Sequence, residues 1–142
     1  MQPNHSTAPV ITELDAARIR ELGARLPDQG RSLQALGELI DMVTAEADIV
    51  PVAGIEPDIV TVNSTVSFRD ELSGSVHRVT VVYPQESSIV DRRISVLSPV
   101  GRALLGRRVG RLSTFAMPDG STRDIRVLAL HYQPEASGEL TR

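Results

Sequence analysis

The stretch SVLSPVGRALLGRRVG, residues 95–110, determines how the rest of the chain is interpreted. Two of its glycines, Gly101 and Gly106, are separated by four residues and followed by Arg107 and Arg108, close to the G-x-x-x-x-G-K-S/T spacing of a phosphate-binding loop. Such a loop requires backbone amides that converge on the phosphates, a lysine, and a hydroxyl group for magnesium. Here helix-forming residues lie between the glycines, and arginines replace the lysine and the hydroxyl residue. We therefore expect no nucleotide site in this stretch.

The same stretch predicts a short helix that follows a strand. Ser98 is a favourable helix cap, Pro99 suits the first helical position, and Gly106 can end a helix in the left-handed conformation. A helix over residues 98–105 would turn one apolar face toward a sheet. That face comprises Val100, Ala103 and Leu104. We expect this to be one short helix inside a β domain.

Runs of apolar and β-branched residues predict β structure in the second half of the chain. The expected strands lie within residues 59–70, 75–84, 94–97, 111–117 and 122–132. LSGS at 72–75 and PDG at 118–120 are typical of tight turns, so we expect hairpins there. We expect an antiparallel β domain over residues 59–134, followed by a tail over 135–142.

The first fifty residues have a helical pattern. Thr12 can cap a first helix, with Asp15 as an imperfect capping box, and this helix would run from about residue 13 to residue 26. A second helix is indicated by apolar residues at alternating steps of three and four, namely Leu33, Leu36, Ile40, Val43 and Ala47. Two such helices with a short connection predict an antiparallel, coiled-coil-like helical hairpin over residues 11–50. The expected tip of this hairpin comprises Pro27, Asp28, Gln29, Gly30 and Arg31.

Two segments outside these elements are expected to lack regular structure. Residues 1–10 are mostly polar, which predicts a disordered tail. Pro51, Gly54 and Pro57 are incompatible with a continued helix, so we expect a linker over residues 51–58. The predicted fold class is α+β, with a short N-terminal helical hairpin followed by the β domain.

The composition excludes several kinds of chemistry. The chain has no cysteine, which rules out disulfides, thiolate metal sites and cysteine nucleophiles. His5, His77 and His131 are widely scattered, and no residue spacing fits a metal site, so we expect no catalytic residue, metal or cofactor. No apolar run is long enough to span a membrane, and residues 1–10 do not resemble a signal peptide. We expect a cytoplasmic protein that is not an enzyme.

Charge is distributed unevenly along the chain. Residues 1–50 hold four arginines and eight acids, whereas residues 59–142 hold eleven arginines and eight acids. The arginines around the expected short helix are Arg92, Arg93, Arg102, Arg107, Arg108 and Arg111. Proteins that bind single-stranded nucleic acid also need stacking aromatic residues, and only Phe115 is near. The sequence leaves open whether these arginines contact nucleic acid directly. It favours a patch that docks on an acidic protein.

Several stretches together resemble a known family. ISVLSPVGRALLGRRVG at 94–110, followed by MPDG at 117–120 and a final strand, is similar to the C-terminal domain of the bacterial Gre transcript-cleavage factors. VPVAGIEPDIVTVNSTVSFRD at 50–70 and VTVVYP at 79–84 resemble still more closely the Rnk-like group of Gre-related proteins, which have a short helical arm. The resemblance covers about residues 11–132.

The resemblance implies an FKBP-like fold for the β domain and RNA polymerase as the partner, bound at the rim of its secondary channel in competition with Gre factors. The expected partner-binding residues are Ser98, Pro99, Arg102, Arg107 and Arg108. Gre factors place two carboxylates at the tip of a longer coiled coil to help hold a catalytic metal, whereas the tip here offers only Asp28. A lone carboxylate is a poor metal site, so we expect no transcript cleavage. We also expect a monomer.

Two functions from other classes stay open. An FKBP-like fold suggests a peptidyl-prolyl isomerase or chaperone, although such a pocket is walled by aromatic residues and this chain has only four of them. Direct regulation of nucleotide metabolism is suggested by the historical name of the Rnk-like group. The sequence shows no nucleotide site that would support it.

Overall fold

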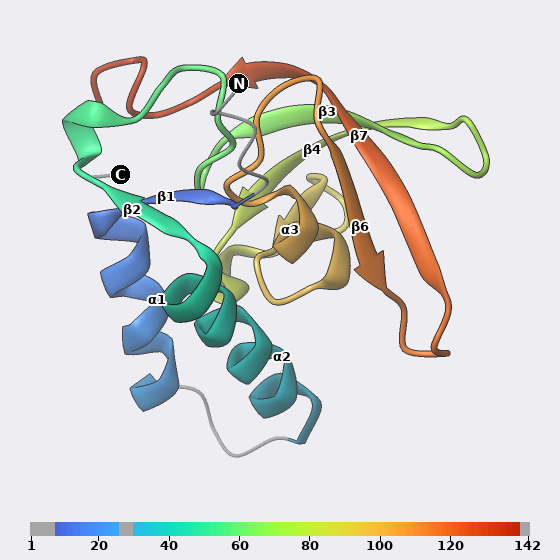
Figure 1. Ribbon diagram of the computed structural model, residues 1–142, viewed down its shortest axis with the longest axis horizontal. Coiled ribbons are helices and arrows are strands. Elements are labelled where there is room, and N and C mark those ends of the chain that lie inside the picture. Colours follow the sequence, from blue (N-terminus) through green and yellow to red (C-terminus); the bar gives the residue numbers. More distant parts are fainter. Residues whose placement is uncertain (1–7, 26–29, 140–142) are drawn as a thin grey trace, which may run out of the picture.

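The computed structural model describes residues 8–25 and 30–139 of the chain. Its helices lie on one side of a five-stranded sheet (Figure 1). The helices are α1 (Glu13–Arg25), α2 (Gly30–Asp41) and α3 (Pro99–Leu104). The strands of this sheet are β3 (Thr65–Asp70), β4 (Val76–Val82), β5 (Arg93–Ser95), β6 (Leu112–Ala116) and β7 (Thr122–Tyr132). This confirms the expected α+β class, whereas the FKBP-like description stays a prediction.

The five strands lie in the order β5-β4-β3-β7-β6, with β3 at the centre. β3 pairs with β4 and β7 in antiparallel fashion, and so does β6 with β7. The expectation of a wholly antiparallel sheet is wrong for one pair, because β5 runs parallel to β4. After β4 the 3-10 turn η3 (Pro84–Glu86) and the loop after it carry the chain back along β4. β5 therefore enters in the same direction as β4.

The first predicted strand, residues 59–70, is wrong in its first half, because β3 begins only at Thr65. Asn63 has a positive φ of 73°, and the amide of Ser64 donates to the carbonyl of Thr61 over 3.0 Å. Asparagine tolerates the left-handed region, so the Asn63-Ser64 pair makes a tight turn inside an apolar run. Ile59 forms only an isolated bridge, with Arg108.

The two N-terminal helices lie side by side, and their connection falls outside the described residues (Figure 1). The second helix was expected to continue to Ala47, but α2 ends at Asp41 and a π-helical turn, η1 (Met42–Glu46), follows it. The amide of Ala47 donates to the carbonyl of Met42, which gives this last turn its wider i to i+5 spacing. The coiled-coil-like hairpin stays a prediction.

The helices and the sheet share one hydrophobic core. Its members from the N-terminal helices are Ala16, Ile19 and Leu22 of α1, Leu36 and Leu39 of α2, and Val43 of η1. Its members from the second half include Val66, Val81, Val96, Leu104, Ile125 and Val127. The residues are almost all aliphatic, as the composition requires. The residues before and after position 50 pack against each other in this core. The expected domain boundary near residue 50 stays a prediction.

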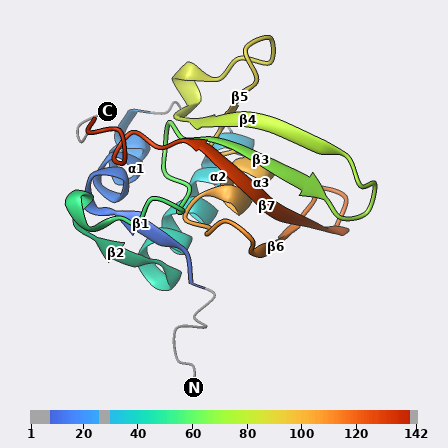
Figure 2. The ribbon, with the colours of Figure 1, turned by 90° about the horizontal axis from the view of Figure 1, so that it is seen from above.

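A second, two-stranded sheet was not predicted. β1 (Val10–Thr12) pairs in parallel with β2 (Asp48–Val50), and the amide of Val10 also donates to the carbonyl of Gly106 over 3.0 Å. The expected tail over residues 1–10 is therefore wrong at Val10, and residues 1–7 lie outside the described part of the chain. Strands of three residues are too short to show an alternating pattern. Figure 2 shows this pair at one side of the larger sheet.

Of the expected C-terminal tail over residues 135–142, residues 135–139 form hydrogen-bonded turns, and residues 140–142 lie outside the described part of the chain. The side chain of Glu135 accepts a hydrogen bond from the hydroxyl of Thr61 over 2.8 Å. The buried side-chain amide of Gln133 donates to the carbonyls of Glu56 and Ile59 over 2.8 and 2.7 Å. The chain after β7 is thus fastened to the segment that precedes β3.

Candidate functional site

The candidate site is built around residues 95–111, which we call the α3 segment. Its helix begins as the sequence predicts, because the hydroxyl of Ser98 accepts from the amide of Gly101 over 3.0 Å and Pro99 occupies the first turn. The same hydroxyl donates to the carbonyl of Ser95 over 2.7 Å. Gly106 follows the helix with a φ of 80°, which confirms its predicted left-handed conformation.

Gly101 has a packing role that the sequence did not reveal. A Cβ atom at this position would lie 2.0 Å from the carbonyl oxygen of Ser95, so only glycine fits. Gly106 is also close to another segment, since its Cβ would lie 2.7 Å from the Cβ of Pro9. The two glycines therefore let α3 approach β5 on one side and β1 on the other.

The backbone amides of the α3 segment are already bonded within the protein. The amides of Gly101 and Arg102 bond to Ser98, and the amides of Leu105 and Gly106 bond to the carbonyls of Gly101 and Val60. A phosphate-binding loop needs such amides to converge on its ligand. The structure therefore agrees with the rejection of a phosphate loop here.

Arg102 joins α3 to the N-terminal helices. Its guanidinium lies 3.4 Å from a carboxylate oxygen of Glu38 on α2 and also donates to the carbonyl of Leu97. The arginine side chain is 20% exposed and the glutamate side chain 55%. A predicted partner-binding residue thus already has an intramolecular partner.

Arg108 is held in a similar way at the other end of the α3 segment. Its guanidinium contacts Asp58 over 2.8 Å and Glu56 over 2.9 Å. The hydrogen bond to Glu56 is the main reason why the pKa of Arg108 is raised, and the same hydrogen bond lowers the pKa of Glu56. The side chain of Arg108 is 34% exposed, so part of it remains accessible to a partner.

A groove of about 370 Å³ lies beside Arg107 and Arg108. The residues that line it come from β1, β2, the segment before β3, the α3 segment and β6, and include Val10, Asp48, Val50, Glu56, Ile59, Arg107, Arg108, Arg111 and Leu112. Arg107 is half-buried, and burial lowers the pKa of its guanidinium against the opposing effect of Glu46. The lining combines apolar residues with charged residues of both signs.

The structure separates the predicted partner-binding residues into three places. Ser98 and Pro99 lie at the start of α3, Arg102 reaches α2, and Arg107 and Arg108 line the groove. They belong to one continuous segment but do not form one cationic patch. Charge alone therefore does not define a single docking surface here.

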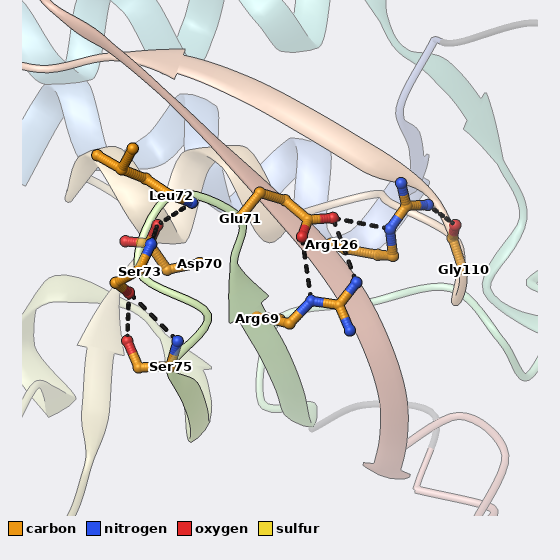
Figure 3. A network of polar contacts seen from close by, with 8 residues as sticks. All are labelled: Arg69, Asp70, Glu71, Leu72, Ser73, Ser75, Gly110 and Arg126. Carbon is orange, nitrogen blue, oxygen red and sulfur yellow. Dashed lines mark hydrogen bonds and ion pairs between the residues drawn. The ribbon is translucent and has the colours of Figure 1, made fainter.

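The end of the α3 segment is tied to the sheet by a network of charged groups (Figure 3). The carboxylate of Glu71 accepts from Arg69 over 3.0 Å and from Arg126 over 2.9 Å. Arg126 also donates to the carbonyl of Gly110 over 2.9 Å. The pKa of Glu71 is lowered, first by its hydrogen bond with Arg69 and next by that with Arg126. This network holds residue 110 against β7.

Asp15 is a site that sequence reasoning missed. Its amide donates to the hydroxyl of Thr12, as the helix cap predicts, but its carboxylate does not complete a capping box. The carboxylate instead accepts from the amide of Val62 over 3.1 Å and from the hydroxyl of Tyr83 over 3.1 Å. Burial raises the pKa of Asp15 to about 6, opposed by the Val62 hydrogen bond. This one side chain joins α1 to the β domain.

Comparisons with known proteins fit this architecture. The sequence model of the family described as "Transcription elongation factor, GreA/GreB, C-term" matches residues 55–132. The "Regulator of nucleoside diphosphate kinase" of Escherichia coli strain K12 is 38% identical over 133 residues, which is 92% of this chain and 93% of that protein. The chain belongs to the GreA/GreB family. The protein of the same name from Shigella flexneri gives the same values.

A solved structure extends the similarity to the fold of this GreA/GreB-family chain. It is described as "Prokaryotic transcription elongation factor GreA/GreB from Nitrosomonas europaea", with a TM-score of 0.65 and 33% identity. The match covers 92% of this chain and 100% of that one. The resemblance inferred from the sequence is thereby confirmed. The family match at 55–132 contains the whole α3 segment, whereas Asp15 lies before it.

The predicted hairpin tip of this GreA/GreB-family chain is largely beyond what the structure describes. Pro27, Asp28 and Gln29 lie outside the described residues, and Gly30 and Arg31 form the start of α2. Among the described residues, no three His, Asp or Glu side chains lie together as a metal-binding group. In the same part of the chain, no helix has the length and apolar character needed to cross a membrane.

Proposed function

We propose that this GreA/GreB-family chain regulates transcription by binding RNA polymerase near the rim of its secondary channel. The observation that carries the proposal is the family match over residues 55–132, which contains the capped helix α3 and the loops around it. The similarity to a curated regulator over 92% of the chain supports the same class of function.

The proposed anchor is the α3 segment, with Ser98, Pro99, Arg102, Arg107 and Arg108 as contact residues. Two of these arginines already form ion pairs, Arg102 with Glu38 and Arg108 with Asp58 and Glu56. A carboxylate on the partner would have to share or displace these pairs, which reduces the net gain from charge. Shape and apolar contact around the start of α3 therefore contribute more to this docking than net charge does.

We further propose that binding competes with Gre factors and that the chain does not promote transcript cleavage. α1 and α2 contain 13 and 12 residues, so at about 1.5 Å per residue each is only ~20 Å long. Asp28 is the only acid in the expected tip at residues 27–31. Hard divalent cations need several oxygen ligands, and one carboxylate on a short arm supplies too few.

Equilibrium binding to purified core RNA polymerase tests the proposal. The expected result is saturable binding of the fluorescently labelled full chain with a Kd of about 1 µM or tighter. A backtracked elongation complex, incubated with the chain alone, should keep its RNA at full length. Absence of binding at tens of micromolar would contradict the docking proposal, and shortened RNA would contradict the absence of cleavage activity.

A further inference from the structure

The loop between η3 and β5, residues 87–92, carries two adjacent apolar side chains in water. Ile89 is 98% exposed and Val90 is 91% exposed. Single exposed apolar residues are common on protein surfaces, but isoleucine and valine are among the residues most often buried. In Figure 2 the loop before β5 projects from the body of the protein. We call Ile89 and Val90 the apolar tip.

The backbone that presents the apolar tip is held by hydrogen bonds. The hydroxyl of Ser88 bonds to the amide and the carboxylate of Asp91, each over 3.2 Å. Ser88 and Arg93 also exchange two backbone hydrogen bonds of 2.9 and 2.8 Å, and the amide of Arg92 donates to the carbonyl of Ile89. A preformed turn loses less conformational entropy on binding than a flexible loop does. The structure therefore holds the apolar tip ready for contact.

Cationic groups lie next to the apolar tip. Arg92 follows it with a φ of 55°, and its exposed side chain forms no ion pair with any residue that the structure describes. Arg93 is paired with Asp91 over 2.9 Å, which neutralises one of the two guanidinium groups. The tip thus combines apolar surface with one unneutralised positive charge. A fitting partner offers an apolar pocket with a carboxylate beside it.

The apolar tip is connected to the proposed anchor through β5. β5 directly follows the turn and leads into the Ser98 cap of α3. The hydrogen bonds of Ser95 to Ser98 and the tight approach of Gly101 to Ser95 couple β5 to α3. Along the chain β5 therefore lies between the apolar tip and the start of α3, and a partner that contacts both spans this strand.

We propose that Ile89 and Val90 insert into an apolar, acid-rimmed pocket of the polymerase and supply much of the docking affinity. This inference rests on the proposed function. A second copy of the chain, whose groove carries charged residues of both signs, is the alternative partner that the sedimentation measurement below distinguishes. Two side chains are also too small an apolar area for stable attachment to a lipid surface.

The test compares three full-length variants in the polymerase binding assay. Ile89→Ser combined with Val90→Ser removes the apolar tip, and Arg92→Asn removes its charge while tolerating the positive φ. Leu72→Ser is the matched control, because Leu72 is also an exposed apolar residue, 81% exposed, but lies on the turn after β3 (Figure 3). All three should unfold at the wild-type temperature, since the changed side chains lie in water.

We expect the double variant to weaken binding about tenfold or more, and Arg92→Asn to weaken it about threefold. The Leu72→Ser control should bind within about twofold of the wild type. Binding by the double variant within about twofold of the wild type overturns this inference and leaves the proposed function intact. Failure of the unaltered chain to bind polymerase contradicts the proposed function and this inference with it. Sedimentation that shows dimers dissociated by the double change would assign the tip to self-association and also overturn the inference.

Discussion

At the residue scale, Asp15 is an acidic group that the fold removes from water. Its carboxyl group is buried, its pKa is raised from 3.8 to about 6, and it accepts hydrogen bonds from Val62 and Tyr83. These partners lie 47 and 68 residues away in the sequence, so no local pattern reveals them. The sequence placed Asp15 correctly in the first turn of a helix, but its long-range role is a property of the fold.

The raised pKa of Asp15 predicts how stability depends on pH. Between pH 3.8 and about 6 the folded state holds this proton more tightly than the unfolded state, so stability falls as the pH rises through that window. A shift of this size corresponds to about 3 kcal/mol at most. Asp15→Asn keeps an acceptor for the amide of Val62 and should remove the fall. Urea unfolding of both proteins from pH 4 to pH 7 measures it, and parallel profiles would contradict the assignment.

Gly101 provides a second prediction at the residue scale. Gly101→Ala should lower the free energy of unfolding by about 2–4 kcal/mol, because the new Cβ would lie 2.0 Å from the carbonyl oxygen of Ser95. Gly37→Ala is the matched control, since a Cβ there meets no atom within 4 Å. It should stabilise α2 by about 0.5–1 kcal/mol. Equal effects of the two changes would show that close packing at Gly101 is not the cause.

At the element scale, elements that are defined by interactions between near neighbours in the sequence were predicted correctly, and elements that depend on distant segments were missed. The Ser98-Pro99 start and Gly106 end of α3 were predicted correctly, because capping is a local interaction. β1 and β2 were missed, since they have three residues each and pair across 38 positions of the chain. The turn at Asn63 was hidden inside an apolar run for which alternation predicted a strand. The sequence did not predict the intramolecular ion pairs of two expected contact residues. Arg102 pairs with Glu38, and Arg108 pairs with Glu56.

The ion pair between Arg102 and Glu38 links α3 to α2 and can be tested at this scale. A double-mutant cycle with Arg102→Met and Glu38→Gln should give a coupling energy of about 0.5–1 kcal/mol, because the pair is partly exposed. Chemical denaturation of the four proteins in low salt measures the coupling. A coupling energy of zero would mean that the helices are held together by their apolar contacts alone.

At the scale of the whole molecule, the N-terminal helices and the sheet behave as one packed unit. They share a core, and Asp15, the Glu38 ion pair and the bond from Val10 to Gly106 each join the two parts. We therefore predict a single cooperative unfolding transition, with helical and near-ultraviolet signals changing together. Two separate transitions, with the helices melting first, would contradict this account and favour an independently mobile arm.

The central claim, that this GreA/GreB-family chain docks on RNA polymerase where Gre factors dock, is tested most directly by competition. The labelled full chain is bound to core polymerase, and a Gre factor is added in increasing amounts while the fraction bound is recorded. The account predicts that the Gre factor displaces the labelled chain completely, and that the midpoint of displacement shifts to higher Gre concentration as the concentration of the chain is raised. Undiminished binding at saturating Gre factor would show that the two occupy different surfaces and would contradict the account.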